Sequence, residues 1–208
     1  MSGPARRTLA RRLESVADFR RPSASLEQYL TPADLAAHVC HLAGLQDDLG
    51  RPVLDLGTGT GMLAIAAALS GAKRVVGVDV DPDALALARE NAAAAGVPDS
   101  IDWLRGDVTR HPFSLSDATI LSNPPFGAQR GNRHADRAFL ETAAAVAAVS
   151  YTIHNAGSQE FVESFADDAG ATVTHAFQAP FPIPKRFEFH TEAERSIDAE
   201  VFRIEWSS

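Results

Sequence analysis

The fold of this chain is constrained most by a regular alternation of strand-like and helix-like segments that begins at residue 51. Short apolar runs suit buried strands, and longer segments with apolar residues at every third or fourth position suit helices. The expected strands span residues 51–57, 74–80, 100–108, 118–123, 150–155, 171–177 and 196–206. Strands separated by helices pair in parallel, but no helix joins the last two strands. The sequence therefore predicts an α/β fold with a seven-stranded, mostly parallel sheet, helices on both faces and an antiparallel last strand.

The first 50 residues stand apart from this alternation and are expected to be helical. Residues 6–19 have apolar positions at helical spacing, which predicts an amphipathic helix. A second helix start lies further along, with Thr31 as N-cap and Pro32 at the first helical position. A chain of 208 residues suits one domain with a sizeable core. We therefore predict a single domain over residues 1–208, with residues 1–50 as an N-terminal helical extension.

The composition is that of an ordinary water-soluble protein, with 45% hydrophobic and 22% charged residues. The chain has neither an apolar run of the ~18–20 residues that span a bilayer nor the apolar core of a signal peptide. The sequence therefore predicts a cytoplasmic location and no membrane partner. The single cysteine, Cys40, is expected to be a buried apolar residue rather than a nucleophile.

The charge is unevenly distributed. The net charge of −8 argues against nucleic-acid binding by bulk charge alone. Residues 1–21, however, carry six arginines against two acids, a net charge of +4 that leaves −12 for the rest. This basic arm is either a phosphate contact or a solvated helix face. The near absence of lysine and the many aspartates resemble proteins of salt-loving archaea, although a GC-rich genome explains the arginine and alanine bias equally well.

A glycine-rich turn follows the first expected strand. Gly57, Gly59 and Gly61 lie between that strand and the next helix. Glycines at this place permit a tight turn and the close approach of a ligand. In dinucleotide-binding domains such a loop holds a pyrophosphate at the helix N-terminus. The turn therefore indicates a nucleotide-like ligand, without identifying it.

Aspartates stand at three successive strand ends. Asp55 ends the first strand, Asp79 the second and Asp107 the third. Open α/β sheets bind ligands at the carboxyl edge, where a carboxylate after the second strand holds ribose hydroxyls. Asp107, with the Val108 amide beside it, is suited to an adenine ring. Such aspartates can instead cap helices and turns, but three at successive strand ends favour a ligand.

The fourth strand ends in the run Asn123, Pro124, Pro125 and Phe126. The two prolines fix the backbone and remove two N–H donors. They can hold the Asn123 side-chain oxygen and the Pro124 carbonyl as two acceptors on one line, with Phe126 as a stacking face. Two acceptors and a ring suit a planar group that carries an NH₂. These four residues are the candidate catalytic set, which acts by positioning and electrostatics rather than as a strong base.

Taken together, these motifs resemble those of class I S-adenosylmethionine-dependent methyltransferases. The run "DLGTGTG" looks like their first motif, and "NPPF" is the Asn/Asp-Pro-Pro-aromatic motif of the amino-methyltransferases, which act on adenine N6, guanine N2 or a glutamine amide. The runs "LEQYLT", "AFLETA", "YTIH" and "KRFEFH" look like the archaeal and eukaryotic enzymes that make N6-methyladenosine in small-subunit ribosomal RNA. The resemblance implies a Rossmann-like methyltransferase with that activity. The alternatives are glutamine methylation of a release factor, another DNA or RNA amino-methyltransferase, or a non-catalytic assembly protein.

The resemblance also implies roles for individual residues. In such relatives the segment that matches "LEQYLT" folds over S-adenosylmethionine, so residues 1–50 would cover the cofactor site. No metal is expected, because no Cys/His spacing suggests zinc. The implied cofactor contacts are Gln28, Tyr29, Thr31, Gly57, Gly59, Thr60, Met62, Asp79, Asp107 and Val108.

Two basic loops and one strand edge are the expected contact surfaces. Arg130 and Arg133 after the motif, and Lys185 and Arg186 before the last strand, would grip RNA, although solvated loop charge is the alternative. Family members often pair with a small zinc-binding activator subunit that adds a strand to a sheet edge. Here that edge would be the third strand near Ile101–Arg105. Ile101 and Trp103 are either available to the partner or packed under a helix.

Overall fold

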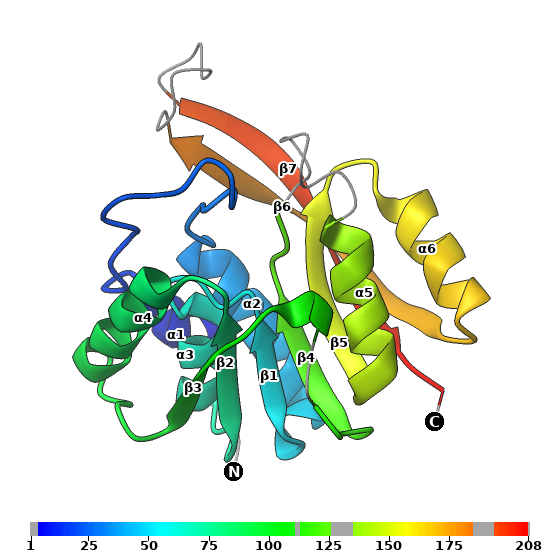
Figure 1. The fold of residues 1–208 in the computed structure, drawn as a ribbon, viewed down its shortest axis with the longest axis horizontal. Helices are drawn as coiled ribbons and strands as arrows, with labels where there is room; N and C mark the ends of the chain where they lie inside the picture. Colours follow the sequence, from blue (N-terminus) through cyan, green and yellow to red (C-terminus); the bar gives the residue numbers. More distant parts are fainter. Residues whose placement is uncertain (1–3, 111–112, 126–134, 185–193, 208) are drawn as a thin grey trace.

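A computed structural model describes residues 4–110, 113–125, 135–184 and 194–207 of the chain (Figure 1). The strands are β1 (Val53–Leu56), β2 (Val75–Asp79), β3 (Ile101–Arg105), β4 (Ala118–Ser122), β5 (Ala147–Asn155), β6 (Thr172–Pro184) and β7 (Glu194–Glu205). The α-helices are α1 (Arg6–Leu13), α2 (Ala33–Leu45), α3 (Met62–Leu69), α4 (Pro82–Ala94), α5 (Ala135–Val146) and α6 (Gln159–Asp168). Two short 3-10 helices are η1 (Asp48–Gly50) and η2 (Val108–Arg110).

Within the described residues the seven strands form one sheet in the order β3-β2-β1-β4-β5-β7-β6. The pairs from β3 to β5 are parallel, whereas β7 runs antiparallel to both of its neighbours. The predicted fold class is thus confirmed. Leu56 lies beside Val78 in one direction and Ser122 in the other. The loops that follow β1, β2 and β4 therefore leave the same edge of the sheet.

Helices cover both faces of this sheet. Residues of α1, α2 and α3 join one face in a first core cluster, and residues of α5 and α6 join the other face in a second. Figure 1 shows α5 and α6 together over one face. Cys40 is fully buried in the first cluster, as predicted. None of the helices in the described part of the chain is long and apolar enough to cross a membrane.

Strand β6 is longer than the sequence pattern predicts. It was expected to end at residue 177, but it continues to Pro184 and pairs with β7 throughout. The added part of the strand contains three prolines, at positions 180, 182 and 184. They are tolerated because β6 is an edge strand, in which every second N–H group points away from the neighbouring strand. Prolines at a spacing of two fall on that outward set.

The start of α2 also differs from the prediction. The helix begins at Ala33, and Pro32 is its N-cap with φ −58° and ψ 137°, so Pro32 is not the first helical residue. No side chain caps this end. Thr31 is therefore not an N-cap, and its hydroxyl is available for a contact elsewhere.

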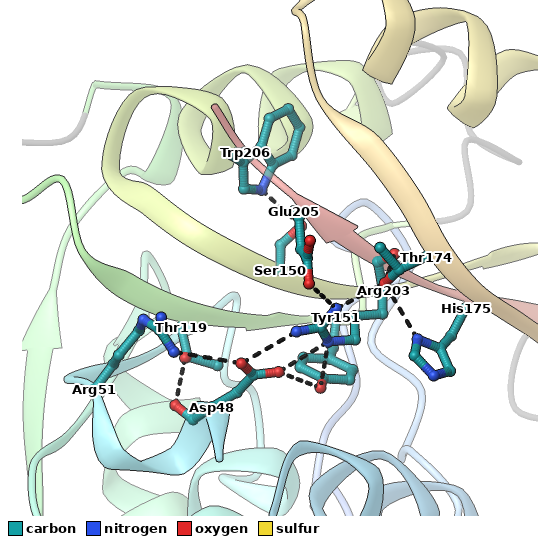
Figure 2. Close-up of polar contacts among 10 residues, drawn as sticks. All are labelled: Asp48, Arg51, Thr119, Ser150, Tyr151, Thr174, His175, Arg203, Glu205 and Trp206. Carbon is teal, nitrogen blue, oxygen red and sulfur yellow. Dashed lines mark hydrogen bonds and ion pairs between the residues drawn. The ribbon is translucent and has the colours of Figure 1, made fainter. Parts of the chain in front are cut away.

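A buried polar network joins the N-terminal extension to β5 and β7 (Figure 2). Asp48, in η1, accepts hydrogen bonds through Oδ2 from the Tyr151 hydroxyl at 2.6 Å and from Arg203 Nε at 2.9 Å. Arg203 also donates to Thr174 and to Glu205, at 2.7 and 2.6 Å. Burial alone would lower the pKa of Arg203, but these carboxylate bonds raise it. Arg203 is therefore held as a cation between three elements.

Candidate active site

A cavity opens where the loops after β1, β2, β3 and β4 meet. Its volume is about 280 Å³, close to the lower end of the ~300–1,000 Å³ typical of small-molecule sites. The lining residues come from these loops, from residues 19–31 and from α5. Of the predicted cofactor contacts, the structure brings together Gln28, Tyr29, Thr31, Gly57, Gly59, Thr60, Asp79, Asp107 and Val108.

Met62 is the exception among the predicted cofactor contacts. It is the first residue of α3, and its side chain is buried in the first core cluster. Among the described residues, Thr60 and Leu63 line the cavity and Met62 does not. The loop contact that was predicted for Met62 rested on its backbone and stays a prediction.

The glycine loop is shaped by backbone angles that favour glycine. Gly57 and Gly59 have φ values of +70° and +54°. A Cβ on Gly57 would lie 3.0 Å from the ring of Phe139, and one on Gly59 would lie 2.9 Å from the ring of Phe19. The glycines therefore allow two aromatic rings to close on the loop. Neither phenylalanine was predicted, because each reaches the loop from a distant segment.

Asp55, at the end of β1, holds this loop in place through hydrogen bonds. Its Oδ2 accepts hydrogen bonds from the Thr58 hydroxyl at 2.5 Å and from the Ala64 amide at 2.9 Å. Burial raises the pKa of Asp55 to about 7, and the two hydrogen bonds oppose this rise. Asp55 thus ties the loop to the start of α3.

Asp79 and Asp107 both line the cavity, but their surroundings differ. Asp79 is buried and accepts backbone N–H bonds from Gly59 at 2.8 Å and Asp81 at 2.9 Å. Burial raises its pKa. Asp107 is exposed, and hydrogen bonds from the Thr109 hydroxyl and amide lower its pKa. Asp79 is therefore the better placed of the two for a desolvated contact, whereas Asp107 lies in the cavity wall with its side chain exposed.

Residues 17–31 form a strap along the cavity, and α4 holds it in place. The Asn91 side chain accepts from the Ala17 amide at 2.9 Å, and it donates to the carbonyls of Ala17 and Thr60 at 3.0 and 2.9 Å. Asn91 thereby joins the strap to the glycine loop. The sequence analysis did not identify it, because a buried asparagine in a helix carries no local signal of such a role.

Gln28 is a second attachment of the strap. Its amide nitrogen donates to Asp81 at 2.7 Å, and its oxygen accepts from the Ser23 amide at 2.8 Å. Gln28 lines the cavity with both ends of its amide engaged in the protein. Tyr29 follows it in the wall, and burial raises its pKa. Residues of "LEQYLT" thus line the cavity, and their predicted contact with the cofactor stays a prediction.

The predicted catalytic run begins where β4 ends. Asn123, Pro124 and Pro125 line the cavity. The Asn123 side-chain nitrogen donates to the Thr31 hydroxyl at 3.0 Å. Its oxygen is buried and has no hydrogen-bond partner among the described residues. Four predicted substrate contacts and one catalytic residue lie outside the described part of the chain, namely Phe126, Arg130, Arg133, Lys185 and Arg186.

The apolar side chains of the edge strand β3 differ in how they pack and how far they are buried. Ile101 is buried, and a Cβ added to Gly77 would lie 2.6 Å from the ring of Trp103. Trp103 also packs close to Gly61. Of the two alternatives for these residues, packing within the protein is therefore the one observed. Leu104 is instead 38% exposed.

Comparison with known proteins places this geometry in a family. The family described as methyltransferase small domain matches residues 34–169. The chain is 38% identical over 202 residues to the uncharacterized protein MJ0284 of Methanocaldococcus jannaschii, with 93% of this chain and 90% of that protein covered. It is 33% identical over 205 residues to the rRNA N(6)-adenosine-methyltransferase Mettl5 of Drosophila melanogaster, with 96% and 95% covered.

A solved structure agrees with these relatives. The crystal structure of the "putative RNA methyltransferase" PH1948 from Pyrococcus horikoshii has a TM-score of 0.88 and 36% sequence identity, over 99% of both chains. The family match spans more than half of the sequence and includes the glycine loop, the three aspartates and Asn123. The chain belongs to the methyltransferase small domain family.

Proposed function

We propose that this protein transfers a methyl group from S-adenosylmethionine to the N6 amine of an adenosine in RNA, with small-subunit ribosomal RNA as the substrate. The observation that carries the proposal is the buried Asn123 oxygen, which lacks a partner among the described residues at a cavity wall. A buried acceptor without a donor is costly, and a substrate amine supplies that donor. The rRNA N(6)-adenosine methylation named for the Drosophila relative supports this choice of amine.

The residues that line the cavity suit S-adenosylmethionine. Asp79 would accept from the ribose hydroxyls, because a carboxylate after the second strand is the usual partner of a ribose. Leu26 and Val80 line the cavity and are 37% and 49% exposed, so they offer apolar contacts to an adenine ring. Asp107 and the Val108 amide would meet the polar edge of that ring. The acidic character of the lining also matches the positive charge of the cofactor.

The role of the protein in transfer is to hold the amine. S-adenosylmethionine supplies a methyl group on a positively charged sulfur, and the N–C bond forms as the S–C bond breaks, leaving S-adenosylhomocysteine and an amine that loses one proton to water. The Asn123 oxygen and the Pro124 carbonyl would accept the two amine hydrogens. This arrangement would leave the nitrogen lone pair free to face the methyl group, and catalysis would then rest on position and electrostatics. Phe126 would stack on the base.

RNA contacts are proposed for four basic side chains of two sequence segments that lie outside the described residues. Arg130 and Arg133 follow the catalytic run in sequence, and Lys185 and Arg186 precede β7. Arginine and lysine side chains bind phosphate, and a base that reacts at N6 must be turned out of its stack into the cavity. The name of the Drosophila relative supports an RNA substrate.

We further propose that a small zinc-binding activator subunit adds a strand to β3. This strand ends the sheet and pairs only with β2 among the described residues. Because Ile101 and Trp103 are packed inward, the contact would rest on main-chain hydrogen bonds, with Leu104 as its exposed apolar side chain. Leu104→Asp should prevent co-purification with such a subunit, whereas Leu115→Asp, at a leucine of similar exposure (40%), should not.

The experiment that tests the function uses the full chain, alone and with its co-purified partner, and labelled S-adenosylmethionine. Small-subunit rRNA and a translation release factor are offered as separate substrates. We expect label on the RNA only, and nuclease digestion should release it as N6-methyladenosine. Label that appears on release factor alone would overturn the proposal in favour of glutamine methylation. Label at another position of the base would overturn the assignment of the amine.

A further inference from the structure

Asn91 is a buried polar side chain of α4 whose amide is bonded at both ends to backbone groups. Its oxygen accepts from the Ala17 amide at 2.9 Å, and its nitrogen donates to the carbonyls of Ala17 and Thr60 at 3.0 and 2.9 Å. A backbone N–H can only donate and a carbonyl can only accept, so the reversed amide would oppose like groups at all three contacts. The side chain, which is 3% exposed, is therefore fixed in one orientation.

The two segments that Asn91 joins meet again beside the cavity. On the strap, Phe19 lies two residues after Ala17, and on the glycine loop, Gly59 lies one residue before Thr60. A Cβ added to Gly59 would be 2.9 Å from the Phe19 ring, and both residues line the cavity. Asn91 therefore holds this contact from both sides, because it binds the strap just before the ring and the loop just after the glycine.

The bonds of Asn91 close a ring of hydrogen bonds along the cavity wall. The Gly59 amide donates to Asp79 Oδ2 at 2.8 Å, and the Asp81 amide donates to Asp79 Oδ1 at 2.9 Å. Asp81 Oδ2 accepts from Gln28, on the strap, at 2.7 Å. Asn91 completes the ring from the glycine loop back to the strap. The position of the strap is thereby linked to that of Asp79, the carboxylate that is proposed to bind ribose.

We propose that Asn91 is a positioning residue for cofactor binding, which holds the strap and the glycine loop at the spacing that S-adenosylmethionine requires. This inference rests on the cofactor named in the proposed function. Asn91 itself does not line the cavity, so it acts through Phe19 on one wall and Gly59 on the other. The docked strap is then a part of the binding site that adds to the affinity for the cofactor.

The binding test compares Asn91→Leu with the wild type by calorimetry with S-adenosylhomocysteine. Leucine has nearly the shape of asparagine and makes none of the three hydrogen bonds. Cofactor binding must then also dock the loosened strap, so the Kd should rise about tenfold to a hundredfold, the range that two ordinary hydrogen bonds cover. With RNA, the KM for S-adenosylmethionine should rise similarly, while kcat at saturating cofactor stays within about twofold. An unchanged Kd would overturn the inference.

A matched control separates positioning from general stability. Leu85 is buried in the same helix and does not line the cavity. Leu85→Ala should lower the free energy of unfolding at least as much as Asn91→Leu, because it leaves a hole in the core. At a temperature where both variants are folded, its Kd for S-adenosylhomocysteine should stay within about twofold of the wild type. Equal weakening of binding by the two variants would overturn the inference.

A second background tests whether Asn91 acts through the strap. In Phe19→Ala the ring that meets Gly59 is removed, so docking of the strap contributes less to binding. Adding Asn91→Leu to Phe19→Ala should then raise the Kd by no more than about threefold, because the two residues act on the same contact. The full factor of the wild-type background would show that Asn91 acts on the glycine loop alone, and it would overturn the role assigned to the strap.

Hydrogen exchange gives a readout that needs neither cofactor nor RNA. The Ala17 amide donates to Asn91, so it should exchange with water about tenfold faster or more in Asn91→Leu and at the wild-type rate in Leu85→Ala. Unchanged exchange in Asn91→Leu would overturn the inference even if RNA is methylated. Faster exchange and weaker binding of S-adenosylhomocysteine in that variant, together with no RNA methylation by the wild type, would overturn the proposed function alone.

Discussion

Two sets of buried polar groups lie at opposite ends of strand β1, and they differ in how fully their hydrogen bonds are made. The set before β1 centres on Asp48 and Arg203. Both carboxylate oxygens of Asp48 accept from nitrogen donors, and the guanidinium donates to Asp48, Tyr151, Thr174 and Glu205. The set after β1 surrounds the cavity. There the Asn123 oxygen lacks a partner among the described residues, and burial raises the pKa values of Asp55 and Asp79.

The difference teaches how to separate architecture from function in this molecule. A fully paired buried network fixes the elements that it joins, and here it ties η1 to β5 and β7 (Figure 2). A polar group at a cavity that lacks a hydrogen-bond partner within the protein is available to bond a ligand. If this distinction holds, loss of a partner in the first set should reduce stability, and loss of a group in the second set that contacts ligand should reduce binding or transfer. Asp55 is the member of the second set that should act on stability, because it is bonded within the protein to Thr58 and Ala64.

The largest effect expected is on the pH dependence of stability through Asp55. Because its pKa is about 7 in the folded protein against an ordinary 3.8, the native state holds a proton that the unfolded chain has lost. The stability that Asp55 contributes should therefore be fully present below about pH 4 and be lost as the pH rises to about 7, by about 4 kcal/mol at most. Urea unfolding of the wild type and of Asp55→Asn across this range measures the difference. Parallel curves for the two proteins would contradict the assignment.

A loss of similar size is expected when Arg203 is replaced by methionine. The change leaves the Asp48 carboxylate buried without its main partner, so the free energy of unfolding should fall by about 3–5 kcal/mol. Urea unfolding at neutral pH measures it, and the affinity of the folded variant for S-adenosylmethionine should be unchanged. The control is Arg51→Met, because Arg51 also contacts Asp48 but is more exposed. It should cost about 1 kcal/mol or less, and equal losses would remove the distinction between the two arginines.

How far the sequence alone predicts these two sets depends on how many positions separate the residues of each contact along the chain. The glycine loop and Asp79 were predicted because strand ends and turns are marked by neighbouring residues. The partner of Asn123 was not, since Thr31 is 92 positions away and was assigned to a helix cap. Phe19 and Phe139 were not predicted either, because they reach the glycine loop from segments that are distant in the sequence.

The first set and the long edge strand show the same limit. Nothing near Asp48 in the sequence indicates Arg203, 155 positions on. Strand β6 was expected to end at residue 177, and the prolines in its second half are acceptable only because the strand lies at the edge of the sheet. Local patterns therefore predicted the fold class and the position of the site, whereas pairings made by the tertiary fold required the structure.

Replacement of Asn123 by alanine tests the second set where its bonding is incomplete. We expect kcat on RNA to fall by about 10²–10³-fold, the range seen when one preorganised transition-state contact is lost. Stability should change by only about 1 kcal/mol, because a single hydrogen bond to Thr31 is removed. Single-turnover methylation and thermal unfolding measure the two quantities. Near-full activity, or a stability loss as large as that of Arg203→Met, would contradict this prediction. Asn123 would then serve the stability of the fold, as Asp48 and Arg203 do, rather than transfer.

The smallest effect is expected from Asp79→Asn, and it concerns cofactor affinity. The substitution keeps an oxygen that can accept from Gly59 but removes the negative charge that a pair of ribose hydroxyls would meet. A charge-assisted hydrogen bond contributes about 1.5–3 kcal/mol, so the Kd for S-adenosylhomocysteine, measured by calorimetry, should rise about tenfold to a hundredfold. Asp102→Asn on β3 removes a nearby exposed charge and should leave the Kd unchanged. Equal weakening by both variants would mean that Asp79 acts only through the overall electrostatic field of the protein. The cavity would then lack the specific ribose contact that distinguishes it from the paired network before β1.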